Sequence, residues 1–294
     1  MQLLCFEDYR EPSQALAGAL EIPCRVIQLH RFPDGESLVQ LPTQLAKRVI
    51  ICQTLNFPND KLIELYLTAK SCRQHGVKEL ILVAPYLCYM RQDKAFKAGQ
   101  VVSQTIIGEF ISELFDHVVT VDPHLHRISR LEEAIHTISA VSLTAANLLG
   151  DYAKAHYQHA VFVGPDEESE QWVKVVAASG RFDFVVARKK RFGDRQVSVE
   201  LPEYTFTNKT AVLVDDVISS GHTLAEATEK LKQAGCNKVV AMCTHALLAP
   251  GAETLLEESG VDELISCDSI LHGSNKVPLA ELLAETVKNL ALKK

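Results

Sequence analysis

The chain has 294 residues, of which 47% are hydrophobic and 23% are charged, and its formal net charge is −7 at pH 7. This composition is typical of a soluble globular protein, and the length suits two domains of about 150 residues each. A net negative charge argues against a general nucleic-acid-binding surface, which would be basic.

The eight cysteines are scattered along the chain, without a Cys-x-x-Cys spacing. Most of them fall in apolar patterns, so we interpret them as reduced core residues of a cytosolic protein rather than zinc ligands or disulfides. The first residues do not resemble a signal peptide, and no run approaches the ~18 apolar residues of a membrane span. We therefore expect a cytoplasmic protein without a membrane partner.

Apolar runs alternate with helical patterns along the chain. In the first half, strands are predicted at 3–6, 25–29, 49–53, 80–84 and 118–121, with helices over 59–75 and 103–114. In the second half, strands are predicted at 160–163, 184–187, 211–214, 239–243 and 263–267, with helices near 167–178, 223–234 and 252–259. This alternation predicts an α/β protein made of two copies of one doubly wound plan, with a domain boundary near residue 141. In such sheets, ligands bind beyond the carboxyl ends of the strands.

In the first half, polar segments follow two of the predicted strands. The segment 31–36 offers Phe32 as a stacking face and places two acidic residues around Gly35, although a plain hairpin turn would give the same pattern. In the segment 85–94, Arg91 can grip a phosphate and Gln92 can contact a base or a phosphate. The residues 95–100 that follow suit a mobile loop over a bound nucleotide.

Three further strand ends carry charged or metal-ligating side chains. His124 follows the fifth strand, where a metal ligand and a solvated histidine are equally consistent with the spacing. Asp166 follows the sixth strand and begins an acidic stretch that also suits an ordinary helix start. The basic run 188–191 follows the seventh strand, and its position in an acidic protein favours anion binding. Lys189 and Arg191 share one side if this run is extended.

The most informative stretch is Val212–Leu224, with the sequence VLVDDVISSGHTL. A buried strand leads into the adjacent carboxylates Asp215 and Asp216, and a polar loop over 219–223 precedes a helix. Backbone N–H groups and the dipole at a helix N-terminus favour an anion, and hydroxyl side chains add donors for a phosphate. An ordinary strand–turn–helix connection would explain the loop alone, but paired carboxylates there need a cation or hydroxyl partner. The stretch therefore predicts a sugar-phosphate site.

Eight motifs, in the same order along the chain, resemble those of the ribose-phosphate pyrophosphokinase family. They are RFPDGE (31–36), NDKLIEL (59–65), PYLCYMRQD (85–93), TVDPHLH (120–126), GPDE (164–167), RKKR (188–191), VLVDDVISSGHT (212–223) and THALL (244–248). The length and the loop at 96–99 are closer to the shorter, archaeal-type members. The resemblance implies two phosphoribosyltransferase-like domains, each with a mainly parallel sheet flanked by helices. It also implies transfer of the diphosphate group of ATP to the anomeric hydroxyl of ribose 5-phosphate, with Mg²⁺.

The resemblance also implies a role for each matching residue. ATP would bind the N-terminal domain, 1–141, through Phe32, Asp34, Gly35, Glu36, Arg91, Gln92 and Asp93. Ribose 5-phosphate would bind the C-terminal domain, 142–294, through Asp215, Asp216, Ser219, Ser220, Gly221, His222 and Thr223. Lys189 and Arg191 would be catalytic, and His124 and Asp166 would support Mg²⁺. The last helix is expected to pack back on the N-terminal domain. An adenine site completed by a neighbouring subunit would require a homo-oligomer, at least a dimer.

Three positions depart from the family pattern. His222 replaces a glycine where a Cβ is expected to restrict the loop, acidic residues follow Asp166, and Gln100 stands where a glutamate is common. Two alternative functions remain at this point. One is a phosphoribosyltransferase acting on a nucleobase, which would share the 212–223 loop. The other is a non-catalytic regulatory homologue, against which the retained Lys189 and Arg191 argue.

Overall fold

The computed structural model describes residues 1–125, 127–128, 130–192 and 196–292, apart from side chains within 190–198 and 291–292. The chain forms two compact units, Met1–Leu143 with Pro278–Lys294, and Thr144–Val277. Each unit has its own sheet and core, and each is described by itself.

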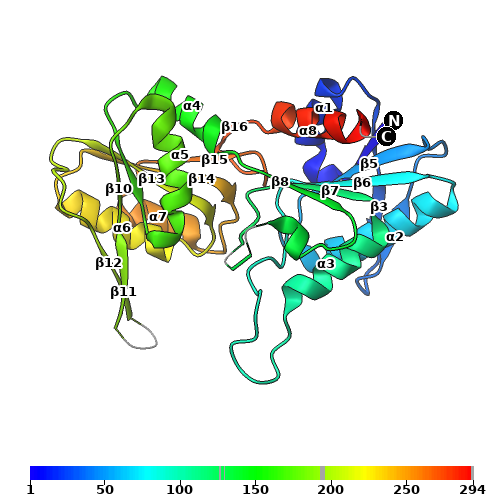
Figure 1. Ribbon diagram of the computed structural model, residues 1–294, viewed down its shortest axis with the longest axis horizontal. Coiled ribbons are helices and arrows are strands. Elements are labelled where there is room, and N and C mark those ends of the chain that lie inside the picture. Colours follow the sequence, from blue (N-terminus) through cyan, green and yellow to red (C-terminus); the bar gives the residue numbers. More distant parts are fainter. Residues whose placement is uncertain (126, 129, 193–195, 293–294) are drawn as a thin grey trace. The chain divides into compact units, whose positions relative to one another are not determined.

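Unit 1 is built on a six-stranded parallel sheet (Figure 1). In spatial order its strands are β2 (Cys24–Val26), β1 (Gln2–Cys5), β5 (Arg48–Cys52), β6 (Glu79–Ala84), β7 (His117–Val121) and β8 (Ser139–Leu143). Helices α1 (Arg10–Ala19) and α8 (Ala280–Leu292) cover one face, and α2 (Pro58–Gln74) and α3 (Ser103–Leu114) cover the other. Because both faces are covered, the inner strands β1, β5 and β6 are mostly apolar and buried. On one face, Leu82 packs in a core with Leu65 and Ile111. A separate hairpin joins β3 (Gln28–Arg31) to β4 (Ser37–Gln40).

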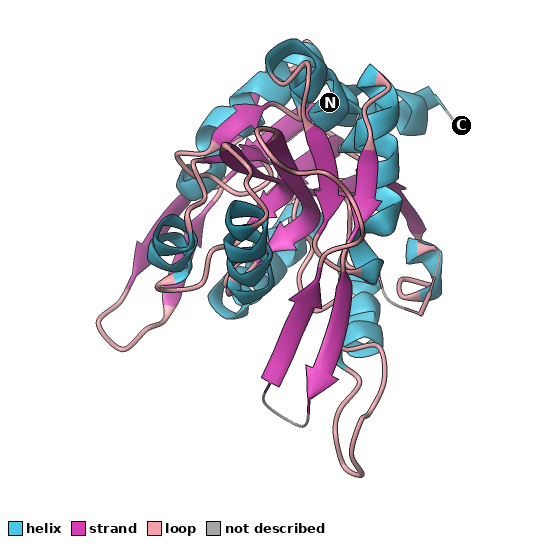
Figure 2. Cartoon of the chain, turned by 90° about the vertical axis from the view of Figure 1, so that its left-hand side faces the viewer, coloured by secondary structure: helices cyan, strands magenta, loops and turns pink. Residues whose placement is uncertain are grey.

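Unit 2 repeats this plan. Its sheet runs β10 (Phe184–Val186), β9 (Val161–Gly164), β13 (Thr210–Ile218), β14 (Lys238–Ala246), β15 (Glu263–Cys267) and β16 (Asn275–Val277). Helix α4 (Ala146–His156) packs on α5 (Glu170–Gly180), and α6 (His222–Gln233) packs on α7 (Ala252–Ser259). Leu213 of the sheet shares a core with Leu224 and Leu256, which places α6 and α7 on that face. A two-stranded ribbon, β11 (Arg188–Phe192) and β12 (Gln196–Glu200), stands apart from the sheet (Figure 2). The described part also holds short 3-10 helices at Glu7–Tyr9, Leu131–Glu133 and Glu167–Ser169.

Both sheets confirm the predicted doubly wound α/β fold. In each, the first strand lies between the second and the third, so the strand order reverses between β1 and β5 in unit 1 and between β9 and β13 in unit 2. The crevice beyond the strand ends at such a reversal is where ligands bind in open α/β sheets. In unit 2, this crevice is where the predicted residues of the 212–223 stretch meet the segment after β9.

The structure differs from the predicted elements in several places. The single strand predicted at 25–29 is divided between β2, in the sheet, and β3, in the separate hairpin. Strand β13 does not end at Val214 but continues to Ile218, because Asp215 and Val217 keep pairing with β14. Helix α1 was not predicted, and neither were α4 and β8. The α1 sequence contains Pro12 and Gly18, which obscure a helical pattern. In the described part of the chain, no helix is long and apolar enough to cross a membrane. All eight cysteines are free, and all except Cys24 are buried.

Candidate active site

The predicted sugar-phosphate loop connects β13 directly to α6. Gly221 is the N-cap of α6 with φ +77°, and His222 is the first helical residue, with an exposed side chain. The start of the loop is held by the segment after β14. The N–H of Leu248 donates to the carbonyl of Ile218, and the N–H of Ala249 donates to that of Ser219, at 2.9 Å each. The first N–H groups of a helix have no intrahelical acceptor, so this terminus offers donors and a favourable dipole to an anion.

The position of His222 changes the interpretation of this departure from the family pattern. Only Gly221 has a positive φ in this loop, so it is the residue whose backbone favours glycine. His222 has ordinary helical backbone geometry at the start of α6, where a Cβ is tolerated. The backbone conformation of His222 therefore gives no reason to expect that its Cβ restricts the loop.

The two carboxylates of β13 accept bonds from the chain itself. Asp215 Oδ1 accepts from the N–H of Asp216 at 2.9 Å, and Asp216 Oδ1 accepts from the N–H of Val217 at 2.8 Å. Asp216 is 1% exposed, whereas Asp215 is only partly buried. Burial raises the pKa of the Asp215 carboxyl well above its ordinary value, and the charges of Asp216 and Asp166 raise it further. This corner of unit 2 therefore carries negative charge that a cation or hydroxyl donors would stabilise.

Lys189 joins three parts of unit 2. It projects from β11, donates through Nζ to Thr223 Oγ1 at 3.1 Å, and lies 3.6 Å from Asp166 Oδ2. The structure thus brings together the basic ribbon, the loop before α6 and the segment after β9. Arg191 lies two residues further along β11, on the same side of an extended strand, but its side chain lies outside the described residues.

Asp166 lies two residues after β9, in a fixed orientation. Its Oδ1 accepts from the N–H groups of Glu168 and Ser169 at 3.2 and 3.3 Å, which caps the short helix Glu167–Ser169. Its other oxygen faces Lys189. The side chains of Glu167 and Glu168 are exposed. Asp166 and Asp215 thus lie at the strand-order reversal of the sheet, where a ligand is expected.

In unit 1, the first group of predicted nucleotide residues forms the turn of the β3–β4 hairpin. Phe32 is exposed, and its N–H donates to the carbonyl of Glu36 at 2.8 Å, while Glu36 N–H donates to Asp34 Oδ1 at 3.1 Å. Gly35 has φ +92°, as such a turn requires. Asp34, Gly35 and Glu36 line a hollow of about 510 Å³ shared with α2.

The base of this hairpin is held by a residue that the sequence did not single out as functional. Glu64 of α2, with 3% of its side chain exposed, accepts from Arg31 at 3.0 Å and from Ser37 Oγ at 3.1 Å. In the sequence, Glu64 stands among apolar residues of the predicted helix, within NDKLIEL. A buried acidic side chain needs a partner, and this is the one local feature that could have pointed to its role.

The second group, Arg91, Gln92 and Asp93, follows β6. Arg91 is exposed, and Gln92 is partly buried with its carbonyl accepting from the N–H of Gln104 at 3.2 Å. Asp93 has only 2% of its side chain exposed and pairs through Oδ1 with Arg127, whose side chain is 48% exposed. Arg127 was not predicted, because no local pattern in the sequence pairs it with Asp93, 34 residues earlier. ATP binding by Asp93 stays a prediction.

The predicted metal residues lie in different units, His124 in unit 1 and Asp166 in unit 2. His124 is partly buried in the segment after β7. In the described part of the chain, no group of three or more His, Cys, Asp and Glu side chains could hold a metal ion. A metal held mostly by water and substrate phosphates would not need such a group.

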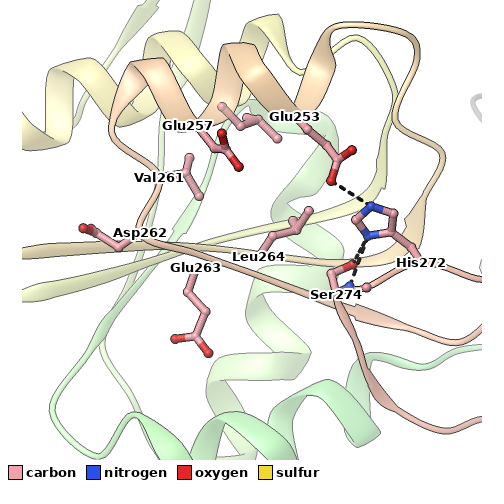
Figure 3. Close-up of a pocket in the computed structure, with 10 residues that line it drawn as sticks. Glu253, Glu257, Val261, Asp262, Glu263, Leu264, His272 and Ser274 are labelled. Carbon is pink, nitrogen blue, oxygen red and sulfur yellow. Dashed lines mark hydrogen bonds and ion pairs between the residues drawn. The ribbon is translucent and has the colours of Figure 1, made fainter.

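A cavity of about 340 Å³ lies elsewhere in unit 2, between α7 and the segment before β16 (Figure 3). On its rim, His272 Nε2 lies 2.8 Å from Glu253 Oε1, and His272 Nδ1 lies 2.8 Å from Ser274 Oγ. None of the predicted site residues in the described part of the chain lines this cavity.

Comparison with known proteins identifies the family. Residues 1–114 match the model of the N-terminal domain of ribose phosphate pyrophosphokinase, and residues 129–281 match that of the phosphoribosyl transferase domain. A ribose-phosphate pyrophosphokinase of Methanopyrus kandleri is 33% identical over 94% of each chain, and one of Methanosarcina acetivorans is 32% identical over 93% of this chain and 94% of its own. A phosphoribosylpyrophosphate synthetase from Mycobacterium smegmatis shares the fold over 100% of both chains, with a TM-score of 0.84 at 22% identity. The chain therefore belongs to the ribose-phosphate pyrophosphokinase family, as its eight motifs predicted.

Proposed function

We propose that this chain transfers the diphosphate group of ATP to the anomeric hydroxyl of ribose 5-phosphate, giving 5-phosphoribosyl 1-diphosphate and AMP. The observation that carries the proposal is the junction in unit 2, where Lys189 meets Thr223 and Asp166 beside the loop before α6. This junction places the ammonium group of Lys189 next to an anion site and to the carboxylate of Asp166. Its chemistry matches a sugar phosphate and a developing phosphate charge.

In the proposed complex, the N-terminus of α6 binds the 5-phosphate through Ser219, Ser220, Gly221, His222 and Thr223. Asp215 accepts hydrogen bonds from the ribose hydroxyls, with the buried Asp216 beside it. The oxygen of the anomeric hydroxyl then attacks the β-phosphorus of ATP and gives up its proton to water. The bond from that phosphorus to the α-phosphate oxygen breaks, and AMP leaves. This reaction needs positioning and charge neutralisation more than covalent chemistry from the protein.

Lys189, together with Arg191, stabilises the charge that develops on the transferred group. Losing one such preorganised donor typically costs about 3 kcal/mol or more, a rate factor of roughly a hundred or above. The ammonium of Lys189 donates to Thr223 Oγ1, which keeps the side chain at the mouth of the loop.

The carboxylates of unit 2 also suit the Mg²⁺ that the family implies. Mg²⁺ prefers oxygen ligands and keeps several waters, so one or two carboxylates are enough. Asp166 presents one oxygen that no backbone N–H caps. Burial, together with the charges of Asp216 and Asp166, raises the pKa of Asp215, and a nearby cation would favour the charged form of these carboxylates. Asp166 would hold the ion in unit 2, and metal binding by His124 of unit 1 stays a prediction. The ion would neutralise charge on the phosphates of ATP.

We further propose that unit 1 binds ATP. The hairpin turn would contact the adenine through Phe32, Asp34, Gly35 and Glu36, and the exposed Arg91 would bind phosphate, with Gln92 and Asp93 beside it. A neighbouring subunit that completes the adenine site would make the protein a homo-oligomer. Light scattering of the purified chain tests this part, and a monomer that retains full activity would contradict it.

The deciding experiment is incubation of the purified protein with ATP, ribose 5-phosphate and Mg²⁺. We expect AMP release that depends strictly on the sugar phosphate, together with a phosphorylated sugar product carrying the diphosphate at its anomeric carbon. Activity on a nucleobase and 5-phosphoribosyl 1-diphosphate, without AMP release from ATP, would instead support a phosphoribosyltransferase.

A further inference from the structure

The ribbon that carries Lys189 is fastened to α6 at a second point. The backbone N–H of Val199 on β12 donates to Glu226 Oε1 on α6 at 2.7 Å. The side chain of Val199 is fully buried and belongs to the same core cluster as Leu224 and Ala227 of α6. The outer edge of the ribbon is therefore anchored to this helix by one charge-assisted hydrogen bond and by apolar packing.

The anchored residue stands directly opposite the predicted catalytic lysine. In the antiparallel register of the ribbon, Lys189 pairs with Val199. Because the Val199 N–H points to Glu226 instead of across the ribbon, this is a non-hydrogen-bonded pair, in which opposing side chains lie closest. Directly opposite residues share a face, so the face that buries Val199 is also the face from which Lys189 reaches Thr223.

Helix α6 therefore contacts both strands of the ribbon. Thr223 and Glu226 are three residues apart on α6, so they lie on neighbouring positions of one helix face. Thr223 binds the lysine ammonium, and Glu226 binds the backbone of the residue opposite that lysine. The N-terminus of the same helix forms the anion site. Helix α6 thus links the position of a bound phosphate to the position of Lys189.

We propose that Glu226 is a positioning residue, which holds the β11–β12 ribbon so that Lys189 points at the phosphate-binding loop; this inference rests on the proposed function. Glu226 binds the Val199 N–H through Oε1, which also lies 4.0 Å from Lys230 Nζ, and it acts on Lys189 through Val199. A carboxylate suits the role, because a hydrogen bond to a charged acceptor is stronger than one to a neutral acceptor. A side chain with an acceptor oxygen at the same reach should therefore preserve most of the effect.

The test compares Glu226→Ala, which removes the acceptor, with Glu226→Gln, which keeps an acceptor oxygen at the same reach. The matched control is Glu229→Ala, which removes an exposed carboxylate from the same helix. We expect Glu226→Ala to lower kcat by about 10- to 100-fold, the loss expected for a charge-assisted hydrogen bond, with KM for both substrates unchanged. Glu226→Gln should recover most of kcat, and the control should match the wild type.

Amide hydrogen exchange supplies a readout that is independent of activity. In Glu226→Ala, the Val199 amide should exchange faster, while the amides of β13 and β14 stay as protected as in the wild type. Wild-type kcat in Glu226→Ala would overturn the inference, and so would unchanged exchange at Val199. Faster exchange throughout β13 and β14 would show a general structural role and would overturn it as well. If the wild type itself releases no AMP, the proposed function fails, while the exchange result still decides whether Glu226 holds the ribbon.

Discussion

Substitution of Gly221 by alanine tests the geometry of the sugar-phosphate loop. At φ +77°, a residue with a Cβ pays about 1–2 kcal/mol of backbone strain. The added Cβ would lie 3.4 Å from Leu256 Cγ and 3.5 Å from the Ala252 carbonyl oxygen, which are ordinary contacts. Almost the whole effect should therefore come from the backbone. If the loop relaxes to remove this strain, its N–H groups turn away from the phosphate.

We expect Gly221→Ala to lower Tm by a few degrees, at about 2–4 °C per kcal/mol, and to raise KM for ribose 5-phosphate by a factor of about 5–30. KM for ATP should not change. The control is His222→Gly, which introduces the glycine usual in the family at a residue with ordinary helical geometry. It should leave KM for ribose 5-phosphate within about twofold of the wild type and lower stability by less than about 1 kcal/mol.

Thermal unfolding and steady-state kinetics of the wild type, Gly221→Ala and His222→Gly test both expectations. Wild-type Tm and KM in Gly221→Ala would refute the requirement for a positive φ at this position. A marked decrease in KM for ribose 5-phosphate in His222→Gly would refute our interpretation of His222, because it would mean that the Cβ at this position obstructs the phosphate.

Three further predictions concern other charged groups. Lys189→Ala should lower kcat at least about a hundredfold in the AMP-release assay, and equal turnover would contradict its catalytic role. Arg127→Ala leaves the buried Asp93 carboxylate without its partner, so the free energy of unfolding should fall by about 1–3 kcal/mol. Urea unfolding curves that match the wild type would contradict this pairing. Burial raises the pKa values of Asp262 and Glu263, but neighbouring lysines and other donors outweigh it and lower both. Their stabilisation is complete above the ordinary values of about 4 and is lost as pH falls through the lowered ones, so Asp262→Asn should flatten the decrease of Tm in acid.

The fold class follows from the order of residues along the chain. Strands covered on both faces must be continuous apolar runs, and helices between them end at glycines such as Gly76 and Gly235, so the alternation is a local property of the sequence. Where each helix or strand begins and ends depends also on contacts with distant parts of the chain. Asp215 and Asp216 look like a strand end, but pairing with β14 carries the strand through both. Helix α1 is stabilised by packing on α8, from the other end of the chain.

The candidate site divides in the same way. Its loop, basic run and strand-end carboxylates are visible in the sequence, because each depends on a few adjacent residues placed after an apolar strand. The pairing of Asp93 with Arg127 is not visible, since the partners are 34 residues apart. The bond from Val199 to Glu226 spans 27 residues and depends on the ribbon register.

The sequence by itself therefore determined the two α/β units, the family and the chemical character of each strand end. The tertiary structure decided which side chain faces which. It showed that Gly221 and not His222 has the unusual backbone, and that Lys189 rests on Thr223. The physical reason is that composition and periodicity are properties of neighbouring residues, whereas a contact between side chains depends on how distant strands and helices pack.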